Sequence, residues 1–258
     1  MNAAYFSLAV LLTQPQSPSP FNGSWLIDVP SAIKDAEQES FAIKNGIFSR
    51  GEGTSNLIVK ADGRFHPISS DDYVDAVAVT IVSPSKVREL DRFKGKLVYS
   101  VVYTVSPDGN TMTRKVVDFS NPDHRPVPTT VTHRRVGRPQ RAGSLVSGRW
   151  ATVGVTTTRD HLTETIELNG TRFSSSGPGG AGYDAMIGGP PVPMRGDAAS
   201  ARVAVNMPND RTIVVNMSLK GISTVLMTMT LLPDDRTINV TARRLSDGVD
   251  SSWVMHKR

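Results

Sequence analysis

The chain has 258 residues and a mass of 27.9 kDa, with a formal net charge of +5 and no cysteine. The lack of cysteine excludes disulfides, thiolate metal sites and cysteine nucleophiles. The basic residues are spread along the chain and do not form a stripe interleaved with aromatic side chains. We therefore expect no nucleic-acid partner.

The first 20 residues combine a short apolar run with a tail rich in proline and serine. The run from Ala3 to Leu12 is too short to span a bilayer, so no membrane span is expected. It is similar to the hydrophobic region of a secretory signal, although no Lys or Arg precedes it. We interpret residues 1–20 as a signal-like or disordered segment and expect a periplasmic or secreted bacterial protein, which also suits the lack of cysteine.

The rest of the chain is an internal duplication. The stretch 67–111 recurs at 193–237 without a gap, and a Gly-x-Trp motif opens each unit, ending at Trp25 and Trp150. At the far ends, His133 is aligned with His256. Identical pairs in the central stretch include Pro67/Pro193, Asp71/Asp197, Lys94/Lys220, Gly95/Gly221, Pro107/Pro233 and Asp108/Asp234. The sequence therefore predicts two units, 21–138 and 139–258.

In chain order, the first unit opens with a strand over 23–29 and a short helix within 31–40, and continues with strands. Asn45-Gly46 and Asp62-Gly63 supply the positive φ that tight hairpins need, so both are expected to be hairpin turns. From residue 75 onward apolar residues alternate with a period of two, which indicates a half-buried strand.

The stretch 97–105 is the clearest strand signal. Its predicted inward face consists of Leu97, Tyr99, Val101, Tyr103 and Val105. The duplicate keeps this division with Val225, Met227, Met229 and Leu231. Strands over 129–136 and 252–257 end the two units, 137–147 is expected to be a linker, and the Gly/Pro-rich stretch 174–193 a long mobile loop.

Short strands joined by turn residues predict an all-β protein, a tandem duplicated antiparallel meander with six to eight strands in each unit. A sheet of that size closes on itself or packs on a second sheet to cover its edges. Two barrel units, or one barrel with pseudo-twofold symmetry, both fit this pattern.

The first unit resembles a family of small exported bacterial lipocalin-like proteins. The similarity lies in Gly23-Ser24-Trp25, in Asp62-Gly63-Arg64-Phe65-His66-Pro67, and in the stretch from Ser106 to Thr113. It extends more weakly over 143–258. The resemblance implies an antiparallel barrel, an envelope location, and tryptophans that close the barrel floor. It implies no activity.

Four positions are the main candidates for acid/base or metal chemistry. Asp71 and Asp197 precede equivalent strands and either face each other as an acid/base pair or cap local turns, of which capping is the more common role. His133 is expected at a solvated strand end. His66 has no partner at metal-ligand spacing, so we expect no metal and no cofactor.

These observations favour a barrel that binds a small hydrophobic or amphipathic ligand. The candidate ligand-binding residues are Tyr99, Tyr103, Met227 and Met229, because they occupy apolar strand faces. Two alternatives stay open. One is an enzyme with acid/base chemistry, for which the weak candidates are His66, Asp71 and Tyr103. The other is a structural envelope protein that binds no ligand. The sequence leaves the oligomeric state open.

Overall fold

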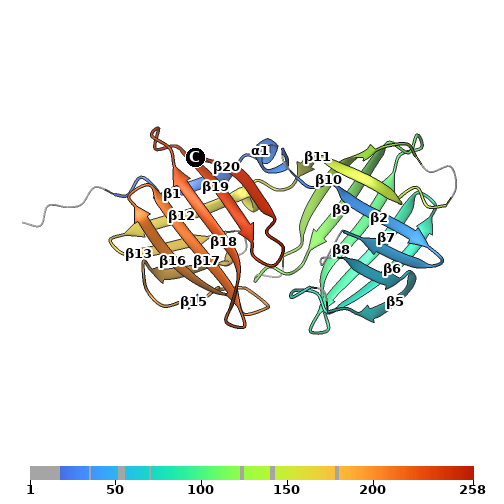
Figure 1. The fold of residues 1–258 in the computed structure, drawn as a ribbon, viewed down its shortest axis with the longest axis horizontal. Helices are drawn as coiled ribbons and strands as arrows, with labels where there is room; N and C mark the ends of the chain where they lie inside the picture. The colour runs from blue at the N-terminus through green and yellow to red at the C-terminus, as the bar shows by residue number, and fades with distance from the viewer. Residues whose placement is uncertain are drawn as a thin grey trace, which may run out of the picture.

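The computed structural model describes residues 18–34, 36–51, 56–69, 71–122, 125–139, 143–177 and 180–258. Two ten-stranded antiparallel sheets are each curled into a nearly closed barrel, and the barrels lie side by side (Figure 1). The expected duplicated all-β architecture is confirmed, with two barrels and more strands in each than the turn spacing indicated. Most of the signal-like segment, residues 1–17, lies outside the described residues. Among the described residues, no helix is long and apolar enough to cross a membrane.

The first barrel contains ten strands, which follow one another in the chain. They are β2 (Glu39–Lys44), β3 (Ile47–Arg50), β4 (Leu57–Lys60), β5 (Asp62–Pro67), β6 (Ala76–Ser83), β7 (Lys86–Phe93), β8 (Lys96–Val105), β9 (Thr111–Asp118), β10 (Val127–Val136) and β11 (Gly148–Thr156).

The second barrel also has ten strands, one of which comes from the start of the chain. They are β1 (Gly23–Ile27), β12 (Thr163–Asn169), β13 (Arg172–Ser176), β14 (Gly182–Met186), β15 (Val192–Pro193), β16 (Arg202–Asn209), β17 (Thr212–Leu219), β18 (Ile222–Leu231), β19 (Thr237–Arg244) and β20 (Asp250–Lys257). A 3-10 turn, η2 (Asp160–Leu162), precedes β12.

The two repeats exchange their first strands. Strand β1 lies between β12 and β20 of the second barrel, and β11 lies between β2 and β10 of the first. The sequence units 21–138 and 139–258 therefore differ from the barrels, because each barrel takes its Gly-x-Trp strand from the other unit. The exchange is possible because the two units carry the same motif and so offer equivalent places for it.

The short helix begins earlier than the stretch 31–40 and is one turn long. Helix α1 (Val29–Ile33) packs between the barrels beside β11 and β20 (Figure 1). The Asp28 carboxylate accepts a hydrogen bond from the backbone N–H of Ser31 at 3.1 Å, and Pro30 occupies the first turn. This capping by Asp28 explains the earlier start.

One of the two expected hairpin turns is confirmed. Asn45 and Gly46 both have positive φ and join β2 to β3. Gly63 instead lies within β5, where the pairing with β6 is shifted by a bulge. The expected loop 174–193 is also interrupted, since β14 pairs with β13 and buries Tyr183 and Ala185 in the second core.

The Gly-x-Trp motif closes one end of each barrel. Trp25 and Trp150 are fully buried, and each donates its indole N–H to a backbone carbonyl four residues earlier. Arg135 covers the ring of Trp150 at 4.0 Å from guanidinium carbon to ring centroid. The motif needs glycine because Gly148 has φ +134 and a Cβ there would collide with the Arg135 guanidinium.

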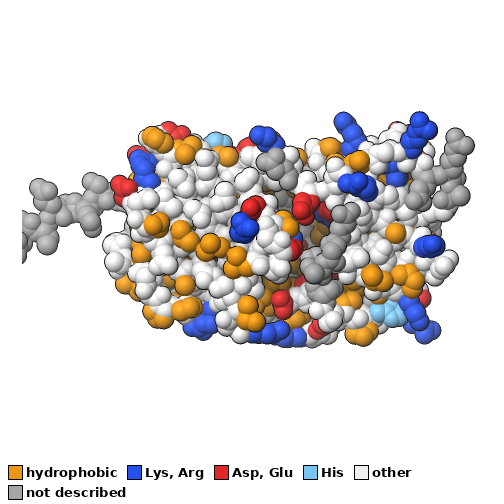
Figure 2. Space-filling model, viewed as in Figure 1, with side chains coloured by type: hydrophobic (Ala, Val, Ile, Leu, Met, Phe, Trp, Pro, Cys, Tyr) orange, Lys and Arg blue, Asp and Glu red, His pale blue; other side chains and the backbone are white. Residues whose placement is uncertain are grey.

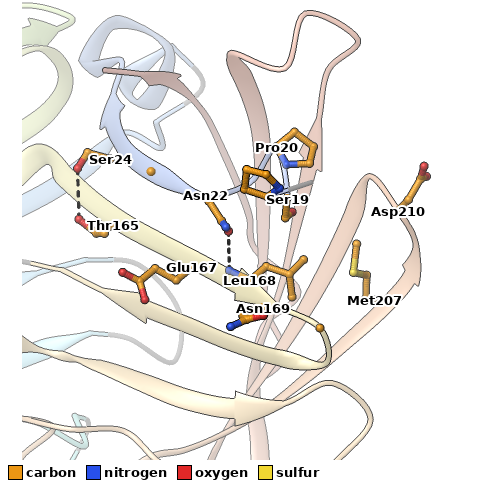
Figure 3. A pocket seen from close by; sticks show the side chains of 13 residues that line it. Ser19, Pro20, Asn22, Ser24, Thr165, Glu167, Leu168, Asn169, Met207 and Asp210 are labelled. Carbon is orange, nitrogen blue, oxygen red and sulfur yellow. Dashed lines mark hydrogen bonds between the residues drawn. The ribbon is translucent and has the colours of Figure 1, made fainter. Parts of the chain in front are cut away.

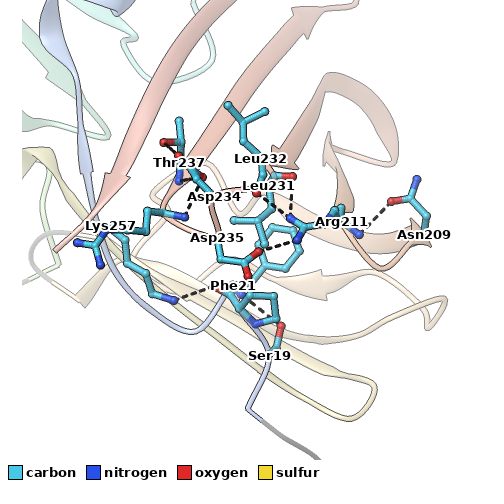
Figure 4. A network of polar contacts seen from close by, with 12 residues as sticks. Ser19, Phe21, Asn209, Arg211, Leu231, Leu232, Asp234, Asp235, Thr237 and Lys257 are labelled. Atoms are coloured by element: carbon cyan, nitrogen blue, oxygen red, sulfur yellow. Dashed lines mark hydrogen bonds and ion pairs between the residues drawn. The ribbon is translucent and has the colours of Figure 1, made fainter.

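The second barrel repeats this closure with Lys257. Its ammonium lies 5.3 Å from the centroid of the Trp25 ring and donates to the Pro20 carbonyl at 2.7 Å. In the adjoining turn, Arg211 binds the Leu232 carbonyl and the Asp235 carboxylate, each at 2.7 Å (Figure 4). Asp234 accepts backbone N–H bonds in that turn, as expected for a structural turn aspartate.

The alignment of His133 with His256 is wrong by one residue. Met112 pairs with His133, whereas its equivalent Ile238 pairs with Met255. A slip of one residue exchanges the two faces of a strand. His133 is therefore fully buried inside the first barrel, contrary to the expected solvated strand end, and His256 is exposed.

A bulge changes the predicted face of β8 at its start. The pairing with β7 shifts between Asp91 and Arg92, and as a result Val98 is buried while Leu97 is 38% exposed. Beyond the bulge the alternation holds, with Val101, Tyr103 and Val105 buried.

Candidate functional site

The interiors of the two barrels differ in chemistry although the backbones are equivalent. Ionisable and hydroxyl-bearing side chains in the first barrel stand where the second carries apolar or small side chains. The equivalent pairs are Arg50/Ser175, Glu89/Val215, Asp91/Met217, Tyr103/Met229, Arg114/Val240 and His133/Met255. Buried charge destabilises a fold unless it is fully paired, and charged interiors are common at functional sites. The first barrel is therefore the stronger candidate to contain a functional site.

Arg50, Glu89, Asp91 and Tyr103 form what we call the acid cluster. Glu89 is fully buried, and its two carboxylate oxygens accept hydrogen bonds from Arg50 Nη2 and from the Tyr103 hydroxyl, both at 2.9 Å. Asp91 is 3% exposed and lies beside Glu89 on the inward face of β7. Its Oδ1 has no hydrogen-bond partner among the described residues.

The electrostatics of the acid cluster change the pKa values of Asp91 and Arg50. Burial, followed by the negative charge of Glu89, raises the pKa of Asp91 to about 8, against a weaker opposite effect of Arg50. Burial is the largest single effect on the pKa of Arg50 and lowers it, but the charges of Glu89, Tyr103 and Asp91 and the hydrogen bond to Glu89 together outweigh burial, so the pKa is raised. Near pH 7 Asp91 is therefore largely protonated, and it lies beside Glu89, which accepts a hydrogen bond from the Arg50 guanidinium.

The same barrel holds a second polar group around Arg114, Glu39 and His133. Arg114 forms an ion pair with Glu39 at 2.7 Å, and His133 Nδ1 lies 3.3 Å from the Thr152 hydroxyl. His133 Nε2 and Arg114 Nε have no partner among the described residues. Burial, and then the charge of Arg114, lower the pKa of His133 to about 4, so this imidazole is neutral near pH 7.

A cleft of about 730 Å³, which we call the junction cleft, lies between the barrels. Both barrels contribute equivalent residues to it, namely Ile68 with Met194 and Asp71 with Asp197. Acidic and hydrophobic side chains meet around the hollow at the middle of the molecule (Figure 2). Its lining also includes Arg50, Leu57, Asp72, Tyr73, Val74, Val77, Ala201, Met217, Leu219, Ile222, Val225, Arg244 and Leu245.

The acid cluster reaches the junction cleft through Arg50. The side chain of Arg50 is 35% exposed and lines the cleft, while its partner Glu89 is fully buried behind it. Asp91 lies opposite Val77 in the β6–β7 pairing, on the same face, and Val77 also lines the cleft. On the far wall Met217 occupies the position equivalent to Asp91. The cleft therefore combines charged residues from both barrels, among them Arg50, Asp71 and Asp197, with an apolar wall around Met217 and Leu219 of the second barrel.

The four predicted ligand-binding residues lie in two different barrels. Tyr99 and Tyr103 face the interior of the first, where Tyr103 packs against Phe41 with ring centroids 5.4 Å apart. Met227 and Met229 belong to the core of the second barrel, and Met229 is fully buried. They do not line one common cavity among the described residues, and none of them lines the junction cleft.

The weak catalytic candidates are also separated. Asp71 lines the junction cleft, and Tyr103 belongs to the acid cluster. His66 Nε2 lies 2.8 Å from Asp62 Oδ1 on the partly exposed strand β5. Asp71 and Asp197 do share the cleft, but each carboxylate also accepts a local backbone N–H, from Tyr73 and Ala201 respectively. Local capping by both aspartates is thus observed, whereas an acid/base pairing between them stays a prediction.

Sequence reasoning missed Glu89 and Asp91, although a signal was there. In the stretch 86–93, alternate residues point to opposite faces of the strand. One face carries Val87, Glu89 and Asp91, and the other carries Arg88 and Arg92. Val87 shares its face with the two carboxylates and is fully buried, so the carboxylates also point inward. The duplicate, with Val215 and Met217 at these positions, has apolar residues on the same face.

Another hollow, of about 750 Å³, lies at the closed end of the second barrel beside residues 18–24 (Figure 3). Its polar side chains serve the local fold: the Asn22 side-chain oxygen accepts from Leu168 N at 2.6 Å, and Ser24 contacts Thr165 at 3.4 Å. Neither a buried charge nor an unpartnered buried polar atom faces it among the described residues.

The fold and the cleft define a two-barrel antiparallel β protein whose first barrel has the more highly charged interior, although Glu164 and Ser175 form a hydrogen bond inside the second. No protein-family model and no curated protein matches the chain.

Asp91 should leave a signature in the pH dependence of folding. The unfolded carboxyl titrates near pH 3.8 and the folded one near 8, so both states are protonated below the lower value. Between the two values the unfolded chain loses the proton first, and stability falls as pH rises, by up to about 1.4 kcal/mol per pH unit. Urea unfolding at about pH 5 to 8 should show this slope, and Asp91→Asn should flatten it. Asp108→Asn, in an exposed turn, is the matched control, and an unchanged slope in Asp91→Asn would contradict the assignment.

Proposed function

We propose that this protein binds a small amphipathic molecule in the junction cleft. The observation that carries the proposal is the division of the cleft between the acid cluster behind Arg50 and the apolar wall around Met217 and Leu219. A ligand in the cleft would place its polar group beside the charged residues of the lining and its apolar part against Met217 and Leu219. A volume of about 730 Å³ is within the range of small-molecule sites.

The duplication supports this proposal by providing an internal comparison. Without a function to maintain, the apolar residues that the second barrel carries at the positions of Glu89, Asp91 and Tyr103 would serve the first barrel equally well, since apolar side chains avoid the desolvation of charge. The first barrel instead keeps Arg50, Glu89 and Asp91 at its mouth. Such a departure from a stable core is expected where a site needs polar groups held in place.

Native mass spectrometry of the full chain, purified from the bacterial periplasm, tests the proposal. We expect a stoichiometric small molecule that is released on denaturation, and a polypeptide mass that lacks most of residues 1–20 if the protein is exported. Ile222→Trp, at a 71% exposed position that lines the cleft, should reduce the bound fraction. Ile58→Trp, at a 63% exposed position outside this lining, is the matched control. A wild-type mass equal to the polypeptide alone would count against tight binding.

One observation favours a second candidate function, acid/base catalysis. Asp91 and Glu89 are neighbouring buried carboxyl groups, and burial together with the charge of Glu89 raises the pKa of Asp91, as a general acid requires. In that case the ligand would be a substrate, and Arg50 would have to leave Glu89 to admit it. Ligand binding does not require Arg50 to leave Glu89, so binding is our first proposal.

A further inference from the structure

The charges along the junction cleft are not evenly balanced. Each arginine of the lining is neutralised by its own acid, Arg50 by Glu89 at 2.9 Å and Arg244 by Asp247 at 2.9 Å. Asp72 lies 3.5 Å from Lys220, whose side chain is 82% exposed. A salt bridge this exposed contributes little.

Asp71 and Asp197 have no cationic partner among the described residues. Asp71 accepts a hydrogen bond from Tyr73 N at 2.7 Å, and Asp197 accepts one from Ala201 N at 2.6 Å and one from the Tyr73 hydroxyl. These bonds hold the carboxylates in place and leave both negative charges uncompensated. The cleft is therefore acidic on a chain whose formal net charge is +5.

A buried carboxyl oxygen near the cleft also lacks a hydrogen-bond donor among the described residues. Asp91, which is 3% exposed and faces the same side as the lining residue Val77, has an oxygen without a hydrogen-bond partner among the described residues. An unsatisfied buried acceptor calls for a donor from outside the cluster. Tyr73, at the rim and 39% exposed, adds an aromatic face of the kind that attracts organic cations.

We propose that the amphipathic ligand of the junction cleft carries a protonated amine. The ammonium group would lie between Asp71 and Asp197 beside the ring of Tyr73, with an N–H directed to the first barrel, and the apolar part would lie along Met194, Met217 and Leu219. This inference rests on the proposed function, since it names the chemical class of the molecule in the same cleft. An anionic head group is excluded by repulsion from the two uncompensated carboxylates.

The test compares three ligands that share an eight-carbon tail: octylamine, octanol and octanoate. Titration of the full chain by calorimetry should give the tightest binding for octylamine, roughly tenfold over octanol, and the weakest for octanoate. Asp71→Asn/Asp197→Asn removes both charges, and the amide oxygens can still accept the local backbone hydrogen bonds. This variant should lose the preference for octylamine over octanol.

The control and the outcomes separate this inference from the proposed function. Asp108→Asn/Asp234→Asn changes the equivalent turn aspartates away from the cleft and should keep the preference. Octanol or octanoate binding as tightly as octylamine would overturn the amine inference and leave the cleft as a ligand site. If none of the three ligands binds, the proposed function and the inference fall together. A preference for octylamine that survives in Asp71→Asn/Asp197→Asn would also overturn the inference.

Discussion

Replacing Trp25 with alanine is expected to destabilise the second barrel, although Trp25 belongs to the first repeat. The side chain is fully buried in the core formed by residues 163–257, because β1 completes that barrel. Removing a buried tryptophan typically costs about 3–5 kcal/mol, which is a large part of the stability of a small barrel. Hydrogen exchange followed by mass spectrometry should therefore show lost protection across 163–257, and 39–136 should stay protected.

The matched variant is Trp150→Ala, which should give the mirror result. Trp150 lies in the core of the first barrel although it follows the linker, so protection should be lost across 39–136. The pair of variants reports on the strand exchange itself and not on tryptophan burial in general. If Trp25→Ala weakened 39–136 instead, β1 would close its own repeat and the exchanged arrangement would be wrong.

Removing Arg50 alone should be far more damaging than replacing the whole acid cluster. Arg50→Ser leaves the fully buried carboxylate of Glu89 without its cation, and breaking such a pair typically costs about 3–5 kcal/mol. The combined variant R50S/E89V/D91M/Y103M places the residues of the second barrel at all four positions. Because a buried ion pair replaced by apolar residues of similar volume is often neutral or stabilising, we expect stability within about 1 kcal/mol of wild type or above it.

Urea unfolding of the three proteins measures this difference, and ligand binding should be lost in the combined variant. Arg211→Ser is the matched control, since Arg211 pairs with Asp235 at 2.7 Å but the two side chains are 37% and 52% exposed. An exposed pair of this kind contributes about 1 kcal/mol or less. A combined variant as unstable as Arg50→Ser would mean that the acid cluster is needed for the fold itself, and the functional reading of the cluster would lose its support.

Several features followed from local sequence because local physics determines them. The alternation in 97–105 and 222–231 predicted which side chains of β8 and β18 face inward, and only the bulge at Val98 departed from it. Asn45-Gly46 predicted a hairpin because few other dipeptides adopt positive φ at both positions. The duplication predicted two equivalent units because the same pattern of turns and strands gives the same backbone.

The partners of each element were decided by the tertiary structure. Because both Gly-x-Trp strands fit both barrels, nothing local to Trp25 tells which barrel it enters; that depends on how residues 28–38 and 157–162 cross between the barrels. The junction cleft likewise has Asp71 and Asp197, which are far apart in the chain, in one lining. The acid cluster depends on both local sequence and tertiary structure. Alternation places Glu89 and Asp91 on one face of β7. The barrel then brings Arg50 from β3 and Tyr103 from β8 to that face. Spacing within a strand is a local property, whereas burial, ion pairing and the shift in the pKa of Asp91 depend on neighbours that only folding supplies.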